Sequence, residues 1–379
     1  MPLTIDQVPK LVFGVGAISS VSEYLQALGI ERPFIVSAPS SRDHAERLRL
    51  NACIDDSTSS EPTLAHFNRL IESARSFRPD AVIGIGGGSV LDAAKLIAAL
   101  CNSSQPIAEA FGIGNLGARN LPLICIPTTA GTGSEVSPNS ILLDEDSQSK
   151  KAVISPQLVP DAAFIDPALT VTVPAHVTAT TGLDALTHCI EAFANNFSHP
   201  LVDTWALDGI RHIAAHLATA VREPANIEAR THLALGSLYG GLCLGPVNTA
   251  AVHALSYPLG SRYHIPHGHA NAIFLPHVIR FNLSDAPERY AAIALALGAQ
   301  QQPTLESTAL AGIDMLWQLI ANTGLEMRLA AFRIPESEIP SLAADGLAVT
   351  RLMKNNLRVI TQQDAESIYR YAYLGQREA

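Results

Sequence analysis

Residues 81–95, AVIGIGGGSVLDAAK, decide the fold class of the N-terminal half. The apolar run Ala81–Ile85 predicts a short buried strand, Gly86–Ser89 interrupts it, and a helix is expected from Val90 onward. Glycines allow backbone N–H groups to approach an anion closely, and the helix N-terminus adds a partial positive charge. This order predicts a phosphate-binding turn. A plain tight turn is the alternative, because GGGS is neither the GxGxxG nor the GK[ST] fingerprint.

The segments on either side of this turn alternate between strand and helix patterns. Further strands are expected at residues 11–13, 34–37 and 121–126, and helices at residues 45–50, 64–77 and in the segment that ends near Gly29. Such alternation is typical of a parallel sheet covered by helices on both faces. Residues 135–160 predict a hairpin and a connector. We therefore expect an α/β dinucleotide-binding domain over residues 1–166.

A second turn, rich in threonine and glycine, follows the strand expected at residues 121–126. It contains Thr128, Thr129 and Thr132, and open α/β sheets bind ligands at the carboxyl ends of their strands. Two neighbouring turns of this kind favour a dinucleotide site. Asp92, in the first turn of the helix after Ser89, has two interpretations: a group near the ligand, or a carboxylate that the helix dipole favours.

The pattern changes to helices alone after Asp166 and Pro167. Helical periodicity is clear over residues 176–196, 202–221, 229–245, 304–325 and 365–375, and we expect an all-helical domain over residues 167–379. Of the 13 histidines in the chain, 11 lie at or after His176. Metal chemistry is therefore expected in this half.

Four residues of the second half are candidate ligands for one metal ion. Asp184 and His188, in TGLDALTHCIEA, are four residues apart in an expected helix, which places them on one face one turn apart. His253 opens another helix-like segment, and His267 lies between Pro266 and Gly268, where the backbone turns. Three imidazoles and one carboxylate suit iron(II) or zinc better than magnesium or calcium.

The other histidines have plainer interpretations. His212 and His216 share the same spacing but lie in an ordinary amphipathic pattern, so we interpret them as surface or core residues. Three more surround the proposed site in the sequence and are either groups that orient the ligands or simple neighbours: His264, His269 and His277.

The composition limits the possible partners and compartment. The net charge is −10 with no basic block, so nucleic acid and anionic membranes are poor candidates. No apolar run approaches the roughly 18–20 residues that a membrane span requires, and the N-terminus lacks the pattern of a signal peptide. Five cysteines without a CxxC pair favour reduced thiols in a cytoplasmic protein.

Four motifs in this order resemble the iron-containing (group III) alcohol dehydrogenases, and the similarity extends over nearly the whole chain. They are GGGSVLDAAK, PTTAGTGSEVS, TGLDALTHCIEAF and AVHALSYPLGSRYHIPHGHANAIFLPH. The resemblance implies an α/β nucleotide-binding domain, an all-helical second domain and an active site in the cleft between them. It also implies iron(II), or zinc in some members, bound by Asp184, His188, His253 and His267.

The resemblance further implies NAD or NADP as the cofactor, with its pyrophosphate over Gly86, Gly87, Gly88 and Ser89. The threonines Thr128, Thr129 and Thr132 would face the phosphates and the nicotinamide side, with Asp92 and Lys150 near the cofactor. The expected reaction is reversible hydride transfer between a small alcohol or other hydroxy compound and NAD(P), with His267 at the reacting centre. Such dehydrogenases are commonly homo-oligomers.

Two positions depart from the family pattern. Tyr257 stands where members commonly carry a histidine that relays the alcohol proton, and a phenol would work there by hydrogen bonding or through water. Ala38 stands where many NAD-dependent members place an aspartate that contacts the adenosine ribose. The choice between NAD and NADP therefore stays open, and the nearby Arg42 is compatible with a 2′-phosphate.

Three alternatives remain at this stage. The stretch IVSAPSSRD also resembles the maleylacetate reductases of the same superfamily, which usually lack the metal-binding carboxylate that Asp184 supplies here. A dehydroquinate synthase-like lyase would need several Lys and Arg side chains for a phosphate-bearing acid, yet the metal-binding segments carry only Arg262. A non-catalytic metal-binding scaffold would leave the two nucleotide turns unexplained.

Overall fold

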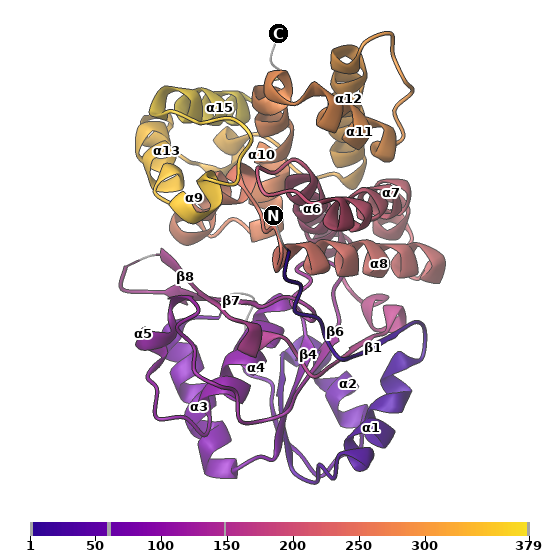
Figure 1. The fold of residues 1–379 in the computed structure, drawn as a ribbon, viewed down its shortest axis with the longest axis vertical. Coiled ribbons are helices and arrows are strands. Elements are labelled where there is room, and N and C mark those ends of the chain that lie inside the picture. The colour runs from indigo at the N-terminus through magenta and orange to yellow at the C-terminus, as the bar shows by residue number, and fades with distance from the viewer. Residues whose placement is uncertain (1–2, 59–61, 148, 377–379) are drawn as a thin grey trace. The chain divides into compact units, whose positions relative to one another are not determined.

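The computed structural model describes residues 3–58, 62–147 and 149–376. Backbone contacts divide the chain into two compact units, one spanning Thr4–Val173 and the other beginning at Pro174 and including Leu3. Each unit is described by itself (Figure 1).

The first unit is built on a parallel sheet of six strands in the order β1-β9-β6-β4-β2-β3. This confirms the predicted parallel sheet. The strands are β1 (Lys10–Phe13), β2 (Pro33–Ser37), β3 (Cys53–Asp55), β4 (Ala81–Gly86), β6 (Leu123–Pro127) and β9 (Ala162–Ile165).

Helices cover both faces of this sheet (Figure 1). On the central strand β4, Val82 packs into one apolar cluster with residues of α3 and α4, whereas Ile83 and Ile85 pack into another with residues of α1 and α2. Both faces of the strand are buried, because successive side chains point to opposite sides, and this explains its uninterrupted apolar run. The helices of the unit are α1 (Val21–Ala27), α2 (Arg42–Arg47), α3 (Leu64–Phe77), α4 (Gly88–Leu100) and α5 (Ile107–Ala110), with 3₁₀ turns η1 (Ala17–Ser20), η2 (Pro39–Ser41), η3 (Pro156–Leu158) and η4 (Pro167–Thr170).

One helix lies earlier in the chain than predicted. The helix expected over residues 45–50 instead spans Arg42–Arg47, and Arg49 adopts a positive φ of 52°. A left-handed residue cannot continue a right-handed helix, so the prediction was wrong for the last residues of this segment.

A smaller sheet is held to α4 by a buried lysine. This sheet contains β5 (Gly112–Ile113), β7 (Asn139–Asp144) and β8 (Ser149–Ile154). Its antiparallel pair β7–β8 confirms the hairpin predicted within residues 135–160. Lys95 of α4 is fully buried and donates from Nζ to the carbonyls of Ser137 (2.8 Å) and Asn139 (2.9 Å). Burial lowers the pKa of Lys95, against the opposing effect of the nearby Asp92 carboxylate.

The described part of the second unit contains helices and no strand, as predicted. Its central helix α6 is buried along most of its length and packs against α7, α8 and α10. The helices are α6 (Ala175–Phe193), α7 (Pro200–Arg222), α8 (Ile227–Leu244), α9 (Ala251–Tyr263), α10 (His267–Asn282), α11 (Pro287–Leu297), α12 (Leu305–Thr323), α13 (Ile339–Leu347), α14 (Thr350–Met353) and α15 (Gln362–Leu374), with 3₁₀ turns η5 (Leu283–Asp285), η6 (Leu329–Phe332) and η7 (Glu336–Glu338). None of the helices described in either unit combines the length and the apolar character that crossing a bilayer requires.

Candidate functional site

Helix α6 carries the first two candidate metal ligands. Asp184 and His188 lie one helical turn apart and are both buried. The Oδ1 atom of Asp184 lies 3.8 Å from Nε2 of His188. The predicted helix and the shared face of these two residues are confirmed.

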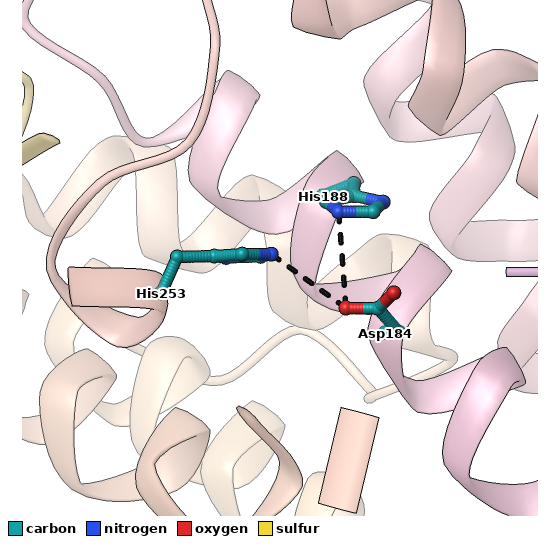
Figure 2. Close-up of side chains that lie close together, drawn as sticks. All are labelled: Asp184, His188 and His253. Carbon is teal, nitrogen blue, oxygen red and sulfur yellow. Dashed lines mark ion pairs between the residues drawn. The ribbon is translucent and has the colours of Figure 1, made fainter. Parts of the chain in front are cut away.

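Helix α9 brings His253 to the same carboxylate oxygen. Its Nε2 atom lies 3.6 Å from Asp184 Oδ1, and its ring stacks on that of His188 with 4.8 Å between ring centroids. Figure 2 shows the three side chains converging from two different helices. Asp184, His188 and His253 form a buried group whose ligand atoms all lie within 4.8 Å of one another.

His267 opens helix α10, directly after the turn in which the sequence analysis placed it. Helix α9 ends at Tyr263, His264 adopts a left-handed conformation, and Pro266 precedes α10. The Nε2 atom of His267 lies 3.7 Å from Asp184 Oδ1. Gly268 permits this approach, because a Cβ at residue 268 would lie 2.1 Å from the carbonyl oxygen of Thr180 on α6.

The spacing of these atoms fits a bound metal ion. The three N–O separations, 3.6–3.8 Å, are longer than a hydrogen bond. Donor atoms around a tetrahedral ion with bonds of roughly 2.0–2.2 Å lie about 3.4 Å apart, so the three separations from Asp184 Oδ1 are close to those around a bound ion. Three imidazole nitrogens and one carboxylate oxygen are a ligand set for a borderline cation such as iron(II) or zinc.

The electrostatics of the group also favour a cation. Burial alone would raise the pKa of Asp184, but the imidazoles of His188, His267 and His253 bring it below its ordinary value. Burial alone would lower the pKa of His253, yet Glu191 and Asp184 raise it to about 10. A pocket that attracts a proton this strongly attracts other positive charge as well.

Glu191 supports His253 and was not singled out in the sequence. Its Oε2 atom lies 2.5 Å from Nδ1 of His253, and its Oε1 atom accepts a hydrogen bond of 2.6 Å from the backbone N–H of Val252. A carboxylate in this position holds the ring so that Nε2 faces Asp184. The available signal was its place in TGLDALTHCIEA, three residues after His188 on the same helix face.

Asn271 is a second supporting residue that the sequence analysis missed. It is fully buried on α10, and its Nδ2 atom donates to Asp184 Oδ1 at 2.7 Å. The same nitrogen lies 3.1 Å from Nε2 of His253 and 3.3 Å from Nε2 of His267. Its spacing of four residues from His267 was a signal, since it places both on one helix face.

The remaining histidines lie elsewhere. His264 is exposed, His269 contacts the backbone carbonyl of Glu326 at 2.7 Å, and His277 packs edge-on against Trp317. His212 and His216 pack instead with His232 between α7 and α8.

Tyr257 lies beside the partly exposed edge of the group. It follows His253 by one turn of α9, and its ring centroid is 5.7 Å from that of His267. Its hydroxyl accepts a hydrogen bond of 3.3 Å from Nη2 of Arg351 on α14. The structure thus brings Tyr257 next to a candidate ligand.

In the first unit, the glycine turn and the threonine-rich turn are adjacent. Strands β4 and β6 pair in parallel, and the N–H of Thr128 donates to the carbonyl of Gly86 at 2.9 Å. Gly87 caps α4, while Gly88 and Ser89 begin it. A Cβ on Gly88 would lie 2.5 Å from Cγ2 of Thr132, and one on Gly87 would lie 3.4 Å from Oγ1 of Thr129. The two turns predicted to be neighbours therefore touch.

The structure also gives the contacts of the other residues considered for cofactor binding, Asp92, Lys150 and Arg42. Asp92 accepts hydrogen bonds from Ser134 Oγ (2.6 Å) and the N–H of Ile141 (2.9 Å), so its carboxylate ties α4 to the segment after the threonine turn. Lys150 lies on β8, paired with Leu143 of β7. Arg42, the residue considered for a 2′-phosphate, forms ion pairs with Glu46 (2.8 Å) and Asp56 (2.9 Å).

Comparison with known proteins places this geometry in a family. Two family models match, "Iron-containing alcohol dehydrogenase" over residues 9–167 and "Fe-containing alcohol dehydrogenase family, C-terminal" over residues 178–373. Long-chain-alcohol dehydrogenase 1 of Geobacillus thermodenitrificans (strain NG80-2) is 39% identical over 319 residues, 83% of this chain and 80% of the relative.

Comparison with solved structures leads to the same family. A 1,3-propanediol oxidoreductase superposes with a TM-score of 0.94 at 30% identity, covering 98% of this chain and 100% of that one. A sulfoacetaldehyde reductase from Bifidobacterium kashiwanohense, in complex with NAD+, superposes with a TM-score of 0.90 at 29% identity, covering 98% and 99%. The chain belongs to the iron-containing alcohol dehydrogenase family.

Proposed function

We propose that this enzyme transfers a hydride between a hydroxy compound and NAD(P), interconverting alcohol and aldehyde or ketone, with one iron(II) or zinc ion bound by Asp184, His188, His253 and His267. The observation that carries the proposal is the convergence of three imidazole Nε2 atoms on a single carboxylate oxygen, at 3.6–3.8 Å. With four protein ligands, a substrate oxygen would be the fifth, and catalytic metal sites expand to five ligands in this way.

Each residue of the centre has a proposed task. When bound, the metal supplies a Lewis acid that lowers the pKa of the substrate hydroxyl, and the nicotinamide accepts the hydride. Glu191 holds the ring of His253, and Asn271 holds Oδ1 of Asp184. Tyr257, beside His267, is placed to pass the hydroxyl proton toward solvent by hydrogen bonding.

We further propose that Gly86, Gly87, Gly88 and Ser89 bind the pyrophosphate, with Thr128, Thr129 and Thr132 on the adjoining side. The contact between the two turns supports this assignment, and the related sulfoacetaldehyde reductase in complex with NAD+ supports the choice of cofactor. Asp92 would act by holding the segment after the threonine turn, and Lys150 would lie near the cofactor. Ala38 presents no carboxylate to a 2′-phosphate, so both NAD and NADP are compatible.

The test is a panel of alcohols and aldehydes assayed with NAD(H) and NADP(H) after reconstitution with iron(II) or zinc. Steady NAD(P)H formation with an alcohol is expected. It also separates this function from a dehydroquinate synthase-like lyase, which returns its cofactor to the starting state. A metal-loaded enzyme that binds NAD(P) but oxidises or reduces none of the panel would contradict the proposal.

We also propose a cytoplasmic location and a homo-oligomeric assembly. All five cysteines are free, and four of them are buried, which suits a reducing compartment. Light scattering coupled to size-exclusion chromatography measures the assembly directly, and a mass equal to that of one chain would contradict it.

A further inference from the structure

On the partly exposed side of the metal centre, Arg351 has no acidic partner among the residues that the structure describes. From this we infer that Arg351 binds an anionic group on the substrate, so that the preferred alcohols and aldehydes carry a carboxylate, sulfonate or phosphonate. This inference rests on the proposed function and names the substrate class of the same site.

The accessible side of the centre is at His267. The side chains of Asp184, His188 and His253 are 5%, 6% and 3% exposed, whereas that of His267 is 28% exposed. Within the unit that begins at Pro174, a small molecule can therefore reach the ligand group along His267. A substrate that binds the metal centre from this side would contact the residues around the His267 imidazole.

Tyr257 connects His267 to Arg351. The phenol ring lies 5.7 Å from the His267 ring, centroid to centroid, and Arg351 Nη2 donates to the phenol oxygen at 3.3 Å. Both Tyr257 and Arg351 are partly exposed. The guanidinium is thus one side chain away from a candidate metal ligand, on the side that solvent reaches.

No acidic side chain in the described part of the chain neutralises the charge on Arg351. Among the residues that the structure describes, no carboxylate oxygen lies within 4.0 Å of its guanidinium. The guanidinium does donate a hydrogen bond to the hydroxyl of Tyr257. Arg262, on the same helix as Tyr257, differs: it pairs with Glu338 and with Asp345 (3.1 Å). A guanidinium has five N–H donors and binds oxyanions through two at once, so Arg351 has donors to offer.

Two other roles are possible for Arg351, and each makes a different prediction. If it only anchors α14 to α9, its loss should weaken reactions of charged and uncharged substrates alike. If it serves a cofactor phosphate, its loss should raise the KM for NAD(P) and leave the choice of substrate unchanged. If it binds an anionic group on the substrate, its loss should weaken reactions of charged substrates far more than those of uncharged ones.

The experiment compares matched aldehydes: succinic semialdehyde with butanal, and sulfoacetaldehyde and phosphonoacetaldehyde with acetaldehyde. The metal-reconstituted wild type should favour each anionic member by about tenfold or more in kcat/KM. Arg351→Met should lower kcat/KM for the anionic members roughly 10–100-fold, the loss expected for one charged hydrogen bond. Uncharged members should change by a clearly smaller factor, because they lose only the hydrogen bond from Arg351 to Tyr257. Arg211→Met, at an exposed ion pair on α7, is the matched control.

Arg351→Lys keeps the charge and should retain part of the preference. Binding of succinate to the metal-loaded protein without cofactor, measured by calorimetry, gives a readout independent of turnover and should weaken in Arg351→Met by a similar factor. The inference is overturned if the wild type shows no anion preference, if Arg351→Met weakens both substrate classes equally, or if only the KM for NAD(P) changes. If no aldehyde of either class is reduced, the proposed function itself fails and this inference with it.

Discussion

Glu191 and Asn271 show how single residues fix the geometry of the metal centre. Glu191 holds Nδ1 of His253, and Asn271 donates to Asp184 Oδ1. Partners of this kind set the tautomer and orientation of a ligand, and their loss weakens metal binding even when every ligand remains. The centre therefore extends beyond the four residues recognised in the sequence.

Replacement of Glu191 by Gln tests this extension. The amide keeps the shape of the side chain and an acceptor for the N–H of Val252, but it removes the negative charge beside His253. We expect zinc affinity to fall about 10–100-fold, measured by competition with a chelator. Glu223→Gln, at an exposed side chain, is the control and should bind as the wild type does. Equal affinity in Glu191→Gln and the wild type would show that the contact is not needed.

Glu135 is a buried acid in the first unit with a pH-dependent effect on stability. Burial raises its pKa from 4.5 to about 7, and its own backbone N–H and Lys95 oppose this only in part. Because the folded-state pKa is above the unfolded-state value, the contribution of Glu135 to stability is full below pH 4.5 and is lost as the pH rises through about 7.

Glu135→Gln should therefore stabilise the protein at about pH 8 relative to about pH 5, by on the order of 3 kcal/mol. Urea unfolding followed by circular dichroism at the two pH values measures this difference. Glu109→Gln, at an exposed residue, should show no such dependence. The same effect of Glu135→Gln at both pH values would contradict the assignment.

At the scale of the elements, the start of α4 is fixed by its contact with the threonine turn. Gly88 leaves no space for a side chain, since a Cβ would lie 2.5 Å from Thr132, whereas Gly87 has ordinary contacts at 3.4 Å and beyond. Gly87 also has a φ of −76°, which any residue adopts. We therefore propose different purposes for these two neighbouring glycines: Gly88 for packing and Gly87 for the approach of a ligand.

Alanine at each position separates the two purposes. Gly88→Ala should lower the free energy of unfolding by about 1–3 kcal/mol through overpacking and weaken NADH binding. Gly87→Ala should leave stability nearly unchanged but weaken NADH binding roughly tenfold, because a methyl group keeps the phosphate from the backbone N–H groups. Urea unfolding and fluorescence titration with NADH measure the two effects. Wild-type NADH affinity in both variants would exclude this turn as the cofactor site.

The features that the sequence predicted best are those that depend on residues close together in the chain. The shared face of Asp184 and His188 follows from helical spacing alone, and the strand, turn and helix around Gly86 follow from a short apolar run and its glycines. The approach of His253 and His267 depends on the packing of three helices. Their places in a helix-like segment and at a turn made them candidate ligands, and the resemblance to a family supported the same set. Glu191 was missed because a glutamate on a helix most often faces solvent, and burial of α6 is a property of the whole unit.

At the scale of the whole molecule, the two proposed binding sites belong to separate compact units. The glycine and threonine turns belong to Thr4–Val173, and the metal ligands belong to the unit that begins at Pro174. Substitutions in one unit should therefore leave the binding property of the other intact. Gly87→Ala should keep its metal, and Glu191→Gln should keep its affinity for NADH.

The central claim is that Asp184, His188, His253 and His267 bind one metal ion. Metal content per chain, measured by inductively coupled plasma mass spectrometry after reconstitution and dialysis, tests it most directly. His267 is the most exposed of the four, so His267→Ala is the variant best suited to fold normally, and His176→Ala, at an exposed residue of α6, is its control. We expect close to one ion per chain in the wild type and the control, and a near-complete loss in His267→Ala. An unchanged metal content in His267→Ala, or no bound metal in the wild type, would contradict the claim.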